Sequence, residues 1–574
     1  MKKLLILSAA AIATLTAQSP TAITPTLQGV SEPFKTYASR NVNAAFSTAA
    51  EGEEAINPNI LYLPKPKVNP SRISTSAVTT PASTMYVQTT GGTLPVTVVS
   101  NFVGLGNGFP GWTNQGLYPP DTTMAVGTNQ IVQWVNVRLA VLSKTTGAPL
   151  LGGAGWVAGN QIWAGLGINS VCATKNQGDP VLQFDRMANR WVLSQFAFNI
   201  ATATGGTHPA YPAAPYALCV AVSQSNDATG AFNLYEYITT YMPDYPKLGV
   251  WPDAYYMTSN DYGFSTVTGA STYRGTRYCA FNRAAMLAGT SAGGVCFSGL
   301  GATHFASLPG DFEGTLAPPA NAAEYMISTD WFTLNSPPYT MQLRRFKPDF
   351  VTPANSTLTD GQGGAPDSFV AMPFDTNVIG SCTDGGGSCI PQPGTDQTLD
   401  SLSMRPMYRL AYRNLGNNRE TLVFTESIGP TGGAAAGIQL VEIRNPGANP
   451  PQVFNNVNFN PNATSRWMGA AATDKLGNIG LGYSISSLTV NPSVVISGRL
   501  RNDIRNTVRG EQTVKFGAGN QTGTAGRWGD YSTMQIDPAD DCTFWYTQEY
   551  TNVSSGANWA TQIIGFRFNS CQVP

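Results

Sequence analysis

The chain has 574 residues, of which 12% are charged, and its 33 basic and 34 acidic side chains nearly cancel. Globular proteins average about 25% charged residues, so bulk charge gives no support for binding to nucleic acid or another polyanion. The 42% of hydrophobic residues suffices for a core, and 59 glycines with 40 prolines indicate many turns. The composition therefore predicts a loop-rich, all-β globular protein.

Residues 1–17 have the pattern of a secretory signal peptide. Lys2 and Lys3 precede an apolar stretch from Leu4 to about Ala13, and small polar residues follow. No later segment reaches the roughly 18 consecutive apolar residues of a membrane-spanning helix. We therefore expect a secreted or cell-surface protein, periplasmic or extracellular, without a membrane span.

Residues 18–94 differ in composition from the rest of the chain. They carry an acidic cluster at 51–54 and a Ser/Thr/Ala-rich stretch at 71–84, and they lack tryptophan. Such a composition is typical of an arm, a linker or a propeptide.

From residue 95 to residue 574, short apolar segments alternate with Gly, Asn and Asp turns, as in a series of β-strands. A unit recurs in which an opening motif, often acidic, leads into a strand, a turn and a returning strand. The candidate units begin at or near Asp121, Asp179, Asp253, Tyr325, Met404, Trp467 and Trp528. Their spacing exceeds the roughly 40 to 50 residues of known propeller repeats, so we expect long loops between strands.

These units predict a seven-bladed β-propeller spanning residues 95–574, with four strands in each blade. The last strand, 561–568, is expected to share one blade with a strand near residues 95–102. This pairing would close the ring and protect its sheet edges. Six or eight blades, or a row of β-sandwiches, are the alternatives.

Eight cysteines in an exported chain favour disulfides over a metal site. Their clustering favours pairs between sequence neighbours. The expected pairs are Cys172 with Cys219, Cys279 with Cys296, Cys382 with Cys389, and Cys542 with Cys571.

Several motifs carry a resemblance to known proteins. The segments 118–126, 178–181, 245–253, 528–532 and 541–545 resemble motifs of large exported bacterial proteins predicted to be β-propellers. The resemblance covers about residues 110–570 and implies this fold and export, but no activity. The chain is more distantly similar to sialidase-type propellers, although it lacks their Ser-x-Asp-x-Gly-x-Thr-Trp box.

In a propeller the innermost strands begin around one mouth of the central channel, so Asp121, Asp179, Asp253 and Asp530 are expected to converge there. Crowded carboxylates repel, so one can stay protonated while another is ionised, which is the arrangement that acid and base catalysis needs. Tyr531, beside Asp530, is a further catalytic candidate. The same carboxylates could hold Ca²⁺, or each could simply accept backbone N–H groups and organise its blade.

Two Arg-Trp pairs, Arg466 with Trp467 and Arg527 with Trp528, precede predicted inner strands. The arginines could bind an acidic group of a ligand or neutralise the neighbouring aspartates. The tryptophans are candidates for ligand contact, although many aromatic residues are expected in the core.

Asp537, Asp540 and Asp541 lie in one turn that is dense in oxygen ligands. They lack the spacing of an EF-hand, so a solvated turn competes with a calcium site. No other cofactor is predicted.

The leading functional hypothesis is an exported propeller that binds an extracellular glycan or protein at one channel mouth. One alternative is a polysaccharide-acting hydrolase or lyase that uses the mouth aspartates, and another is a structural surface protein. Nucleic acid is not an expected partner.

Overall fold

The computed structural model describes residues 19–39, 76–77, 86–88, 92–113, 117–205, 210–300, 305–329, 339–361, 369–374, 388–403, 405–429, 435–524, 526–556 and 558–572. The prediction of an all-β protein is confirmed, because strands predominate and the helices are short. The helices include α1 (Phe34–Ser39), η2 (Gly159–Leu166), α2 (Val171–Thr174), α3 (Arg283–Ala288) and η4 (Pro353–Asn355). The predicted signal peptide lies outside the described residues.

The first half of the chain forms successive antiparallel sheets whose strands follow one another in sequence. The first sheet contains β6 (Thr123–Val126), β7 (Gln130–Val135), β8 (Arg138–Ser143) and β9 (Val157–Ala158). The second contains β10 (Gly178–Asp185), β11 (Arg190–Thr202), β12 (Ala210–Ser223) and β13 (Phe232–Thr239). The third contains β14 (Met242–Val250), β15 (Ala254–Phe264), β16 (Ser271–Asn282) and β17 (Gly294–Phe297).

The second half repeats this plan. The fourth set contains β18 (Leu308–Glu313), β19 (Glu324–Thr329), β20 (Tyr339–Lys347) and β22 (Val370–Phe374), and β21 (Thr357–Thr359) pairs with β20. The fifth set contains β25 (Met407–Asn414), β26 (Glu420–Ile428), β27 (Gly437–Arg444) and β28 (Gln452–Phe459). The sixth set contains β29 (Ser465–Thr473), β30 (Ile479–Ser486), β31 (Ser493–Arg499) and β32 (Gln512–Lys515). The seventh set contains β33 (Thr533–Ile536), β34 (Phe544–Tyr550), β35 (Ala560–Phe568) and β5 (Val96–Val103). A separate hairpin contains β23 (Ser388–Gln392) and β24 (Thr395–Asp400).

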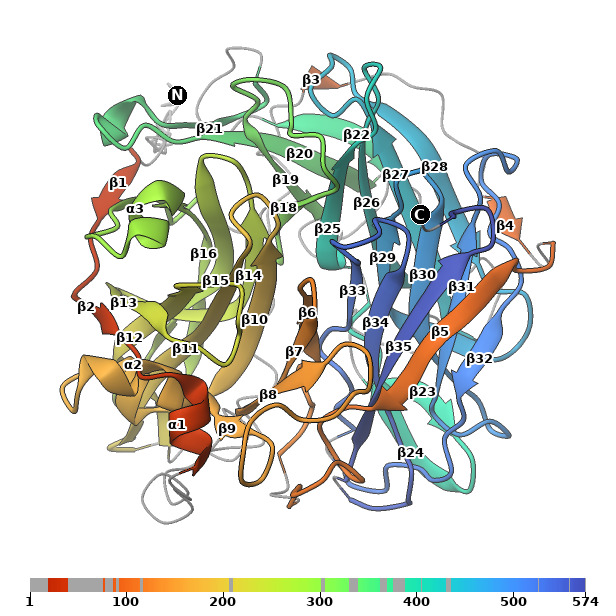
Figure 1. Ribbon diagram of the computed structural model, residues 1–574, viewed down its shortest axis with the longest axis horizontal. Helices are drawn as coiled ribbons and strands as arrows, with labels where there is room; N and C mark the ends of the chain where they lie inside the picture. The colour runs from red at the N-terminus through yellow and green to blue at the C-terminus, as the bar shows by residue number, and fades with distance from the viewer. Residues whose placement is uncertain are drawn as a thin grey trace, which may run out of the picture.

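The first strands of these sets are neighbours in space. Strand β6 contacts β10, and contacts continue through β14, β18, β25, β29 and β33, which contacts β6 again. Between β18 and β25 the contact is a parallel ladder, which joins the fourth and fifth sets into one large sheet. Figure 1 shows the sheets disposed around a common centre. Strands β35 and β5 pair antiparallel, which confirms the predicted pairing of the chain's last strand with a strand near residues 95–102.

Two of the predicted unit starts are wrong by one strand. Asp253 lies in the turn between β14 and β15, and Tyr325 lies in β19, the second strand of its set. In the third and fourth sets the left-handed position is not an aspartate: in β14 it is Tyr245, one residue after Asp244, and before β18 it is Ala306. Met404 lies outside the described residues.

Segments near the N-terminus add strands to the outer edges of the sheets. Strand β1 (Thr21–Ile23) pairs antiparallel with β17, and β2 (Leu27–Val30) pairs antiparallel with β13. Strands β3 (Ser76–Ala77) and β4 (Tyr86–Gln88) pair in parallel with β22 and β28. Added strands cover backbone groups that would otherwise be exposed at an edge.

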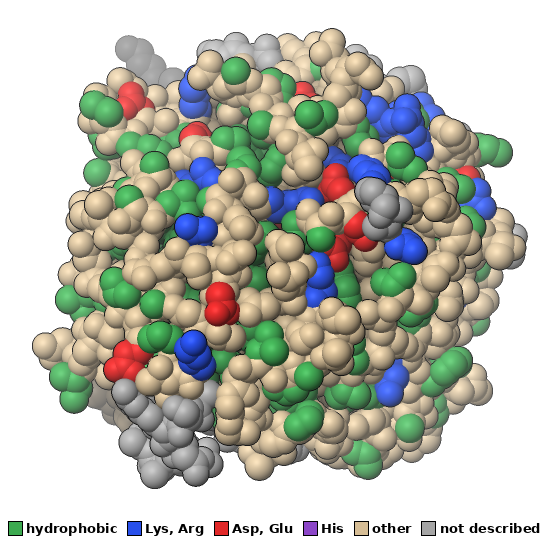
Figure 2. All heavy atoms as spheres, in the orientation of Figure 1, with side chains coloured by type: hydrophobic (Ala, Val, Ile, Leu, Met, Phe, Trp, Pro, Cys, Tyr) green, Lys and Arg blue, Asp and Glu red, His purple; other side chains and the backbone are tan. Residues whose placement is uncertain are grey.

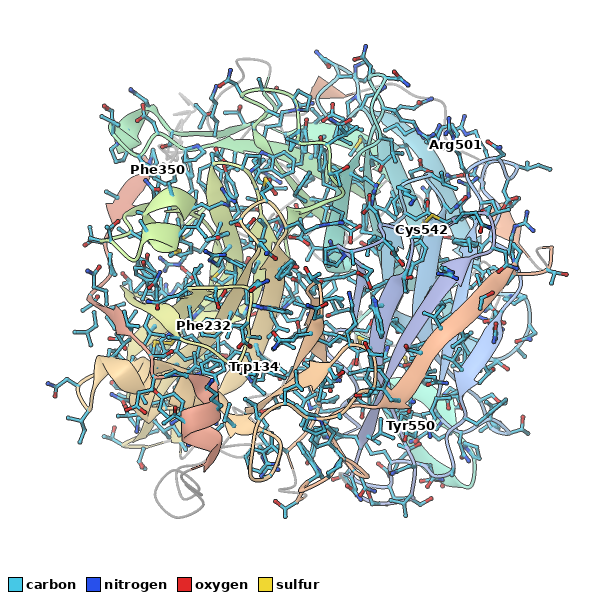
Figure 3. The ribbon with its side chains drawn as sticks, in the orientation of Figure 1. Trp134, Phe232, Phe350, Arg501, Cys542 and Tyr550 are labelled. Carbon is cyan, nitrogen blue, oxygen red and sulfur yellow. A yellow bond between two sulfur atoms is a disulfide. The ribbon has the colours of Figure 1, made fainter. Side chains whose placement is uncertain are left out.

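Apolar side chains fill the space between neighbouring sheets. Trp134 of β7 and Phe232 of β13, labelled in Figure 3, are both fully buried. Gly480 and Gly482 of β30 pack against the last sheet so closely that a Cβ at Gly482 would lie 2.4 Å from the Tyr546 ring. The face shown in Figure 2 carries few charged side chains, in keeping with the composition. No helix within the described ranges is long and apolar enough to cross a membrane.

Three of the four expected disulfides are confirmed. Cys172 on α2 binds Cys219 on β12, Cys279 on β16 binds Cys296 on β17, and Cys542 binds Cys571 after β35. Cys382 lies outside the described residues, so its pairing with Cys389 stays a prediction.

Candidate functional site

Left-handed backbone recurs where first strands begin. Asp121 has φ 48°, Asp179 has φ 47°, Tyr245 has φ 53° and Asp530 has φ 59°. In β10 and β14 this residue sits within a break in the pairing register with the next strand. Aspartate adopts this conformation more readily than most residues. The recurring aspartates therefore serve backbone geometry at the strand entrances, and Tyr245 takes the equivalent place in the third set.

Hydrogen bonds connect three of these entrances. The backbone N–H of Tyr245 donates to Oδ2 of Asp179 at 3.0 Å, which joins β14 to β10. The Tyr531 hydroxyl donates to the carbonyl of Pro180 at 2.8 Å, and the Tyr245 hydroxyl donates to the carbonyl of Asp530 at 3.2 Å. Residues from the second, third and last sheets thus meet at one end of the ring of first strands.

A buried lysine lies beneath this meeting point. The Lys247 side chain is fully buried, and its Nζ donates to the carbonyl of Pro246 at 2.9 Å. The same Nζ lies 3.3 Å from the ring centroid of Tyr245 and 4.2 Å from that of Tyr531. Aromatic faces attract a cation, but burial still lowers the pKa of Lys247 to about 8, against the opposing effect of Asp179 and other nearby carboxylates.

Two arginines border the same cluster. Arg527 donates to both carboxylate oxygens of Asp530 at 2.7 Å, and it also reaches Asp400 at 3.4 Å. The Arg405 guanidinium lies 5.4 Å from the ring centroid of Tyr245. The predicted pairing of Arg527 with a neighbouring aspartate is therefore seen in the geometry.

The carboxyl groups of Asp179 and Asp244 have strongly raised pKa values. Burial raises the pKa of Asp179 to about 6, and the charge of Asp530 adds to this, while Lys247 and the N–H of Tyr245 oppose it. Burial raises the pKa of Asp244 to about 8, and the charges of Asp179 and Asp530 contribute. These effects require the three carboxyl groups to lie within electrostatic reach of one another.

Asp121 belongs to the same neighbourhood. It is 3% exposed, and Nδ2 of Asn136 donates to its Oδ2 at 3.2 Å. Its charge acts on the pKa of both Lys247 and Tyr531. The structure thus brings together Asp121, Asp179, Asp530 and Tyr531, which sequence reasoning had placed at one mouth.

The cluster has a buried layer and an accessible layer. Lys247, Tyr245 and Tyr531 are buried, whereas Asp244 and Asp530 are partly exposed. Groups whose pKa values lie near neutrality can donate or accept a proton under physiological conditions. The accessible carboxylates can also accept hydrogen bonds from hydroxyl groups.

The prediction that Asp253 joins this cluster is wrong. Asp253 follows β14 rather than preceding it, so it lies at the opposite end of the first strands. There its carboxylate accepts the hydroxyl of Tyr256 at 3.2 Å. The error follows directly from the misplaced start of the third unit.

The first Arg-Trp pair does not belong to the cluster, and the tryptophans of both pairs are core residues. Arg466 forms an ion pair with Glu511 at 2.6 Å. Trp467 and Trp528 are fully buried, and their ring centroids lie 5.6 Å apart. Their predicted contact with a ligand is therefore corrected to packing between the last two sheets.

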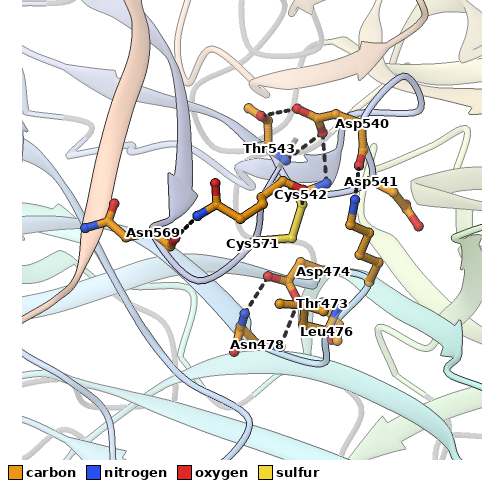
Figure 4. The surroundings of a disulfide bond; sticks show 12 residues. Thr473, Asp474, Leu476, Asn478, Asp540, Asp541, Cys542, Thr543, Asn569 and Cys571 are labelled. Carbon is orange, nitrogen blue, oxygen red and sulfur yellow. Dashed lines mark hydrogen bonds between the residues drawn. A yellow bond between two sulfur atoms is a disulfide. The ribbon is translucent and has the colours of Figure 1, made fainter. Parts of the chain in front are cut away.

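The three candidate calcium ligands already bind protein groups, and Figure 4 shows those of Asp540. Asp537 forms an ion pair, Asp540 accepts a hydroxyl and two backbone N–H groups, and Asp541 lies between two arginines. Lys144 lies 2.9 Å from Asp537, and the Thr543 hydroxyl lies 2.6 Å from Asp540. Asp541 binds Arg186 at 2.9 Å and also binds Arg413. Within the described ranges no group of three or more His, Cys, Asp or Glu could hold a metal ion. Calcium binding stays a prediction.

Sequence reasoning missed Asp244, Lys247 and Arg405. A signal existed for the first two, because Tyr245-Pro-Lys-Leu aligns with Asp179-Pro-Val-Leu when each segment is placed at the start of its first strand. Arg405 has no such signal, since it precedes β25 in a segment without a recognisable repeat.

Comparisons with known proteins give only distant likenesses. No protein-family model matches the chain, and no curated protein matches it. Among solved structures, polysaccharide lyase Uly1 is 12% identical with a TM-score of 0.36, over 80% of this chain and 92% of that one. A protein of unknown function from Dyadobacter fermentans is 9% identical with a TM-score of 0.26, over 83% and 100%. The GH43 endo-arabinanase from Bacillus licheniformis is 10% identical with a TM-score of 0.24, over 58% and 95%. Likenesses of this size carry no conclusion about function.

Proposed function

We propose that the chain is an exported seven-bladed β-propeller that binds an extracellular glycan where β6, β10, β14 and β33 begin. The cyclic contacts of the first strands and the pairing of β35 with β5 support this fold. The predicted signal peptide and the three disulfides support export.

One observation carries the binding proposal. The carboxyl groups of Asp244 and Asp530 are partly exposed, Lys247, Tyr245 and Tyr531 beside them are buried, and Arg527 binds both oxygens of Asp530. A small number of convergent polar groups fixes the orientation of a ligand in a binding site. Sugar hydroxyls both donate and accept, so they suit a site that offers carboxylates and guanidinium groups together.

A protein ligand is the other candidate for the same mouth. A protein surface would have to bury the ion pair of Asp530 and Arg527, and removing an ion pair from water is costly. A glycan leaves water in the site to satisfy the remaining groups, and for this reason we favour it.

Catalysis on a polysaccharide is the second function that an observation favours. Asp244 with a pKa of about 8 is protonated at neutral pH, whereas Asp179 with a pKa of about 6 is mostly ionised. One group could then donate a proton to a leaving oxygen while the other accepts one. The hydrogen bond from Tyr245 to Asp179 equally suits a purely structural role, in which the carboxylate holds two strands together.

Binding is tested with labelled neutral oligosaccharides of different linkage and the mature protein. Asp530→Asn should weaken binding about tenfold, because a lost charged hydrogen bond is worth about 1.5 kcal/mol. Asp244→Asn should weaken binding less, because the pKa of Asp244 is raised to about 8 and its protonated carboxyl group makes only neutral hydrogen bonds at pH 7. Asp349→Asn is the matched control, since Asp349 accepts only nearby backbone and side-chain N–H groups in a loop after β20. Equal affinity for all the variants, with unchanged thermal midpoints, would contradict the proposed site.

Turnover is tested with Asp179→Asn, Asp244→Asn and Asp530→Asn by measuring the release of reducing ends from polysaccharides. Under the enzyme hypothesis, Asp179→Asn and Asp530→Asn abolish turnover and leave folding intact. Under the structural hypothesis they mainly lower the thermal midpoint, and no turnover is found for the unmodified protein.

A further inference from the structure

A group of arginines gathers at the end of the molecule opposite to the aspartate cluster. This arginine patch comprises Arg419 in the β25–β26 turn, Arg444 at the end of β27, and Arg501 and Arg505 after β31, with the buried Arg499 at the end of β31 next to them. Figure 2 shows Lys and Arg side chains gathered toward the upper right of the visible face, where Figure 3 labels Arg501. Such a concentration stands out in a chain with only 33 basic residues.

The patch has too few carboxylates to neutralise it. Glu442 lies 2.7 Å from Arg444 and 3.6 Å from Arg499, so it serves two guanidinium groups. Asp503, between Arg501 and Arg505 in the sequence, forms its ion pair with a further arginine, Arg509, at 2.5 Å. Arg505 donates to backbone carbonyls of β28. The side chains of Arg419 and Arg501 form no hydrogen bond or ion pair with any described residue.

Other arginines surround Arg419. Its Nε is buried without a hydrogen-bond partner in the described part of the chain, and its guanidinium packs against Gly477 of the β29–β30 turn. Burial, together with the charges of Arg444 and Arg501, lowers the pKa of Arg419. A bound anion would relieve this repulsion.

The patch shares its loops with a hollow of about 590 Å³. Tyr325, Arg345 and Lys347 line the hollow, as do Glu420 next to Arg419 and Gly447 in the loop that follows Arg444. Lys347 is exposed there, whereas Arg345 is buried and donates to the backbone carbonyls of Pro446 and Ala448. An extended anionic chain could contact both regions, whereas a small anion would use only one.

We propose that the arginine patch and the adjoining hollow bind an acidic polysaccharide through its sulfate or carboxylate groups. Guanidinium groups suit these anions because their planar donors match two oxygens at once. Single-stranded nucleic acid fits less well, since it needs free aromatic faces for its bases. The Phe454 ring is covered by Arg444 at 3.1 Å and by Arg505 at 4.7 Å.

The test measures binding of the mature protein to dextran sulfate, polygalacturonate and neutral dextran at physiological salt. We expect binding to one or both acidic polymers, weakened by added salt, and none to dextran. The variant Arg419→Gln/Arg501→Gln should bind the acidic polymer at least about tenfold more weakly, because it loses two charged contacts. Sulfate and carboxylate are distinguished by which polymer binds more tightly.

The control variant Arg190→Gln/Arg567→Gln removes the same charge from positions outside the patch. It should change the affinity less than about twofold, because only long-range attraction is lost. The proposal is overturned if neither acidic polymer binds, if both double variants weaken binding equally, or if oligothymidylate binds more tightly than either polymer. Since Asp244 and Asp530 lie at the other end of the strands, failure here leaves the proposed neutral-glycan site standing.

Discussion

The two ends of the ring of first strands differ in their balance of positive and negative side chains. At the aspartate cluster, Asp179, Asp530, Lys247 and Arg527 lie close together, and carboxylates and cations are both present. At the arginine patch, cations outnumber carboxylates and Arg501 is exposed. The first arrangement largely neutralises itself within the protein, whereas the second leaves charge for an external partner.

This difference separates charges that hold the fold together from charges that are available for binding. Paired, buried groups raise the cost of losing either partner. Exposed, like-charged groups repel one another and cost stability until an anion binds. The following predictions test that separation.

The largest effect is expected at Arg409, a buried arginine of the first strand β25. Its guanidinium binds Asp311 at 2.6 Å and Glu313 at 2.7 Å, and all three side chains are buried. Arg409→Met leaves two carboxylates without their counter-charge, so the free energy of unfolding should fall by about 3 to 5 kcal/mol. Urea unfolding measures this loss. A loss below about 1 kcal/mol, as is typical of surface ion pairs, would remove the distinction between the two kinds of charge.

A smaller effect is expected from the titration of Asp179. Its pKa is raised to about 6 by burial, so between about pH 4 and pH 6 the folded state keeps a proton that the unfolded chain releases. The stability that this proton supplies is full below about pH 4 and is lost as the pH rises through about 6, with a loss on the order of 3 kcal/mol.

Asp179→Asn isolates this contribution, because its amide oxygen can still accept the N–H of Tyr245. Urea unfolding at about pH 4 and about pH 6.5 should show a larger fall for the unmodified protein than for the variant. Equal falls would mean that Asp179 titrates normally, and that the cluster is more open to water than its burial indicates.

The smallest effect is expected at the patch. Arg419→Gln removes one of several mutually repelling cations, so the free energy of unfolding should change by no more than about 0.5 kcal/mol, and in the stabilising direction. Thermal unfolding at low salt measures the change, with Arg190→Gln as the control. A destabilisation above about 1 kcal/mol would show that Arg419 has a structural partner.

The sequence predicted the fold class, the clear hairpins and three disulfides because these depend on local patterns. Alternating apolar residues and turns define β29 and β30, for example, and neighbouring cysteines lie on adjacent strands such as β16 and β17. The first strands of the third and fourth sets, β14 and β18, were not predicted as unit starts. The left-handed residue is Tyr245 within β14 and Ala306 before β18, rather than an aspartate.

The candidate site could be predicted only in part. Asp121, Asp179 and Asp530 share a motif at the strand entrances, so their convergence follows from a ring of similar units. Lys247 and Arg405 join them through packing between different sheets, and no local pattern encodes this. The arginine patch was also missed, because net charge averages over a surface on which opposite charges lie apart.

The most direct test of two chemically distinct ends is a crossed binding experiment. The Asp530→Asn and Arg419→Gln/Arg501→Gln variants are titrated with a neutral oligosaccharide and with dextran sulfate over a range of salt concentrations. We predict that Asp530→Asn weakens only the neutral ligand, with little effect of salt, and that the double variant weakens only dextran sulfate, in a salt-dependent way. If both variants weaken binding of the same ligand by similar factors, the two ends do not act as separate sites.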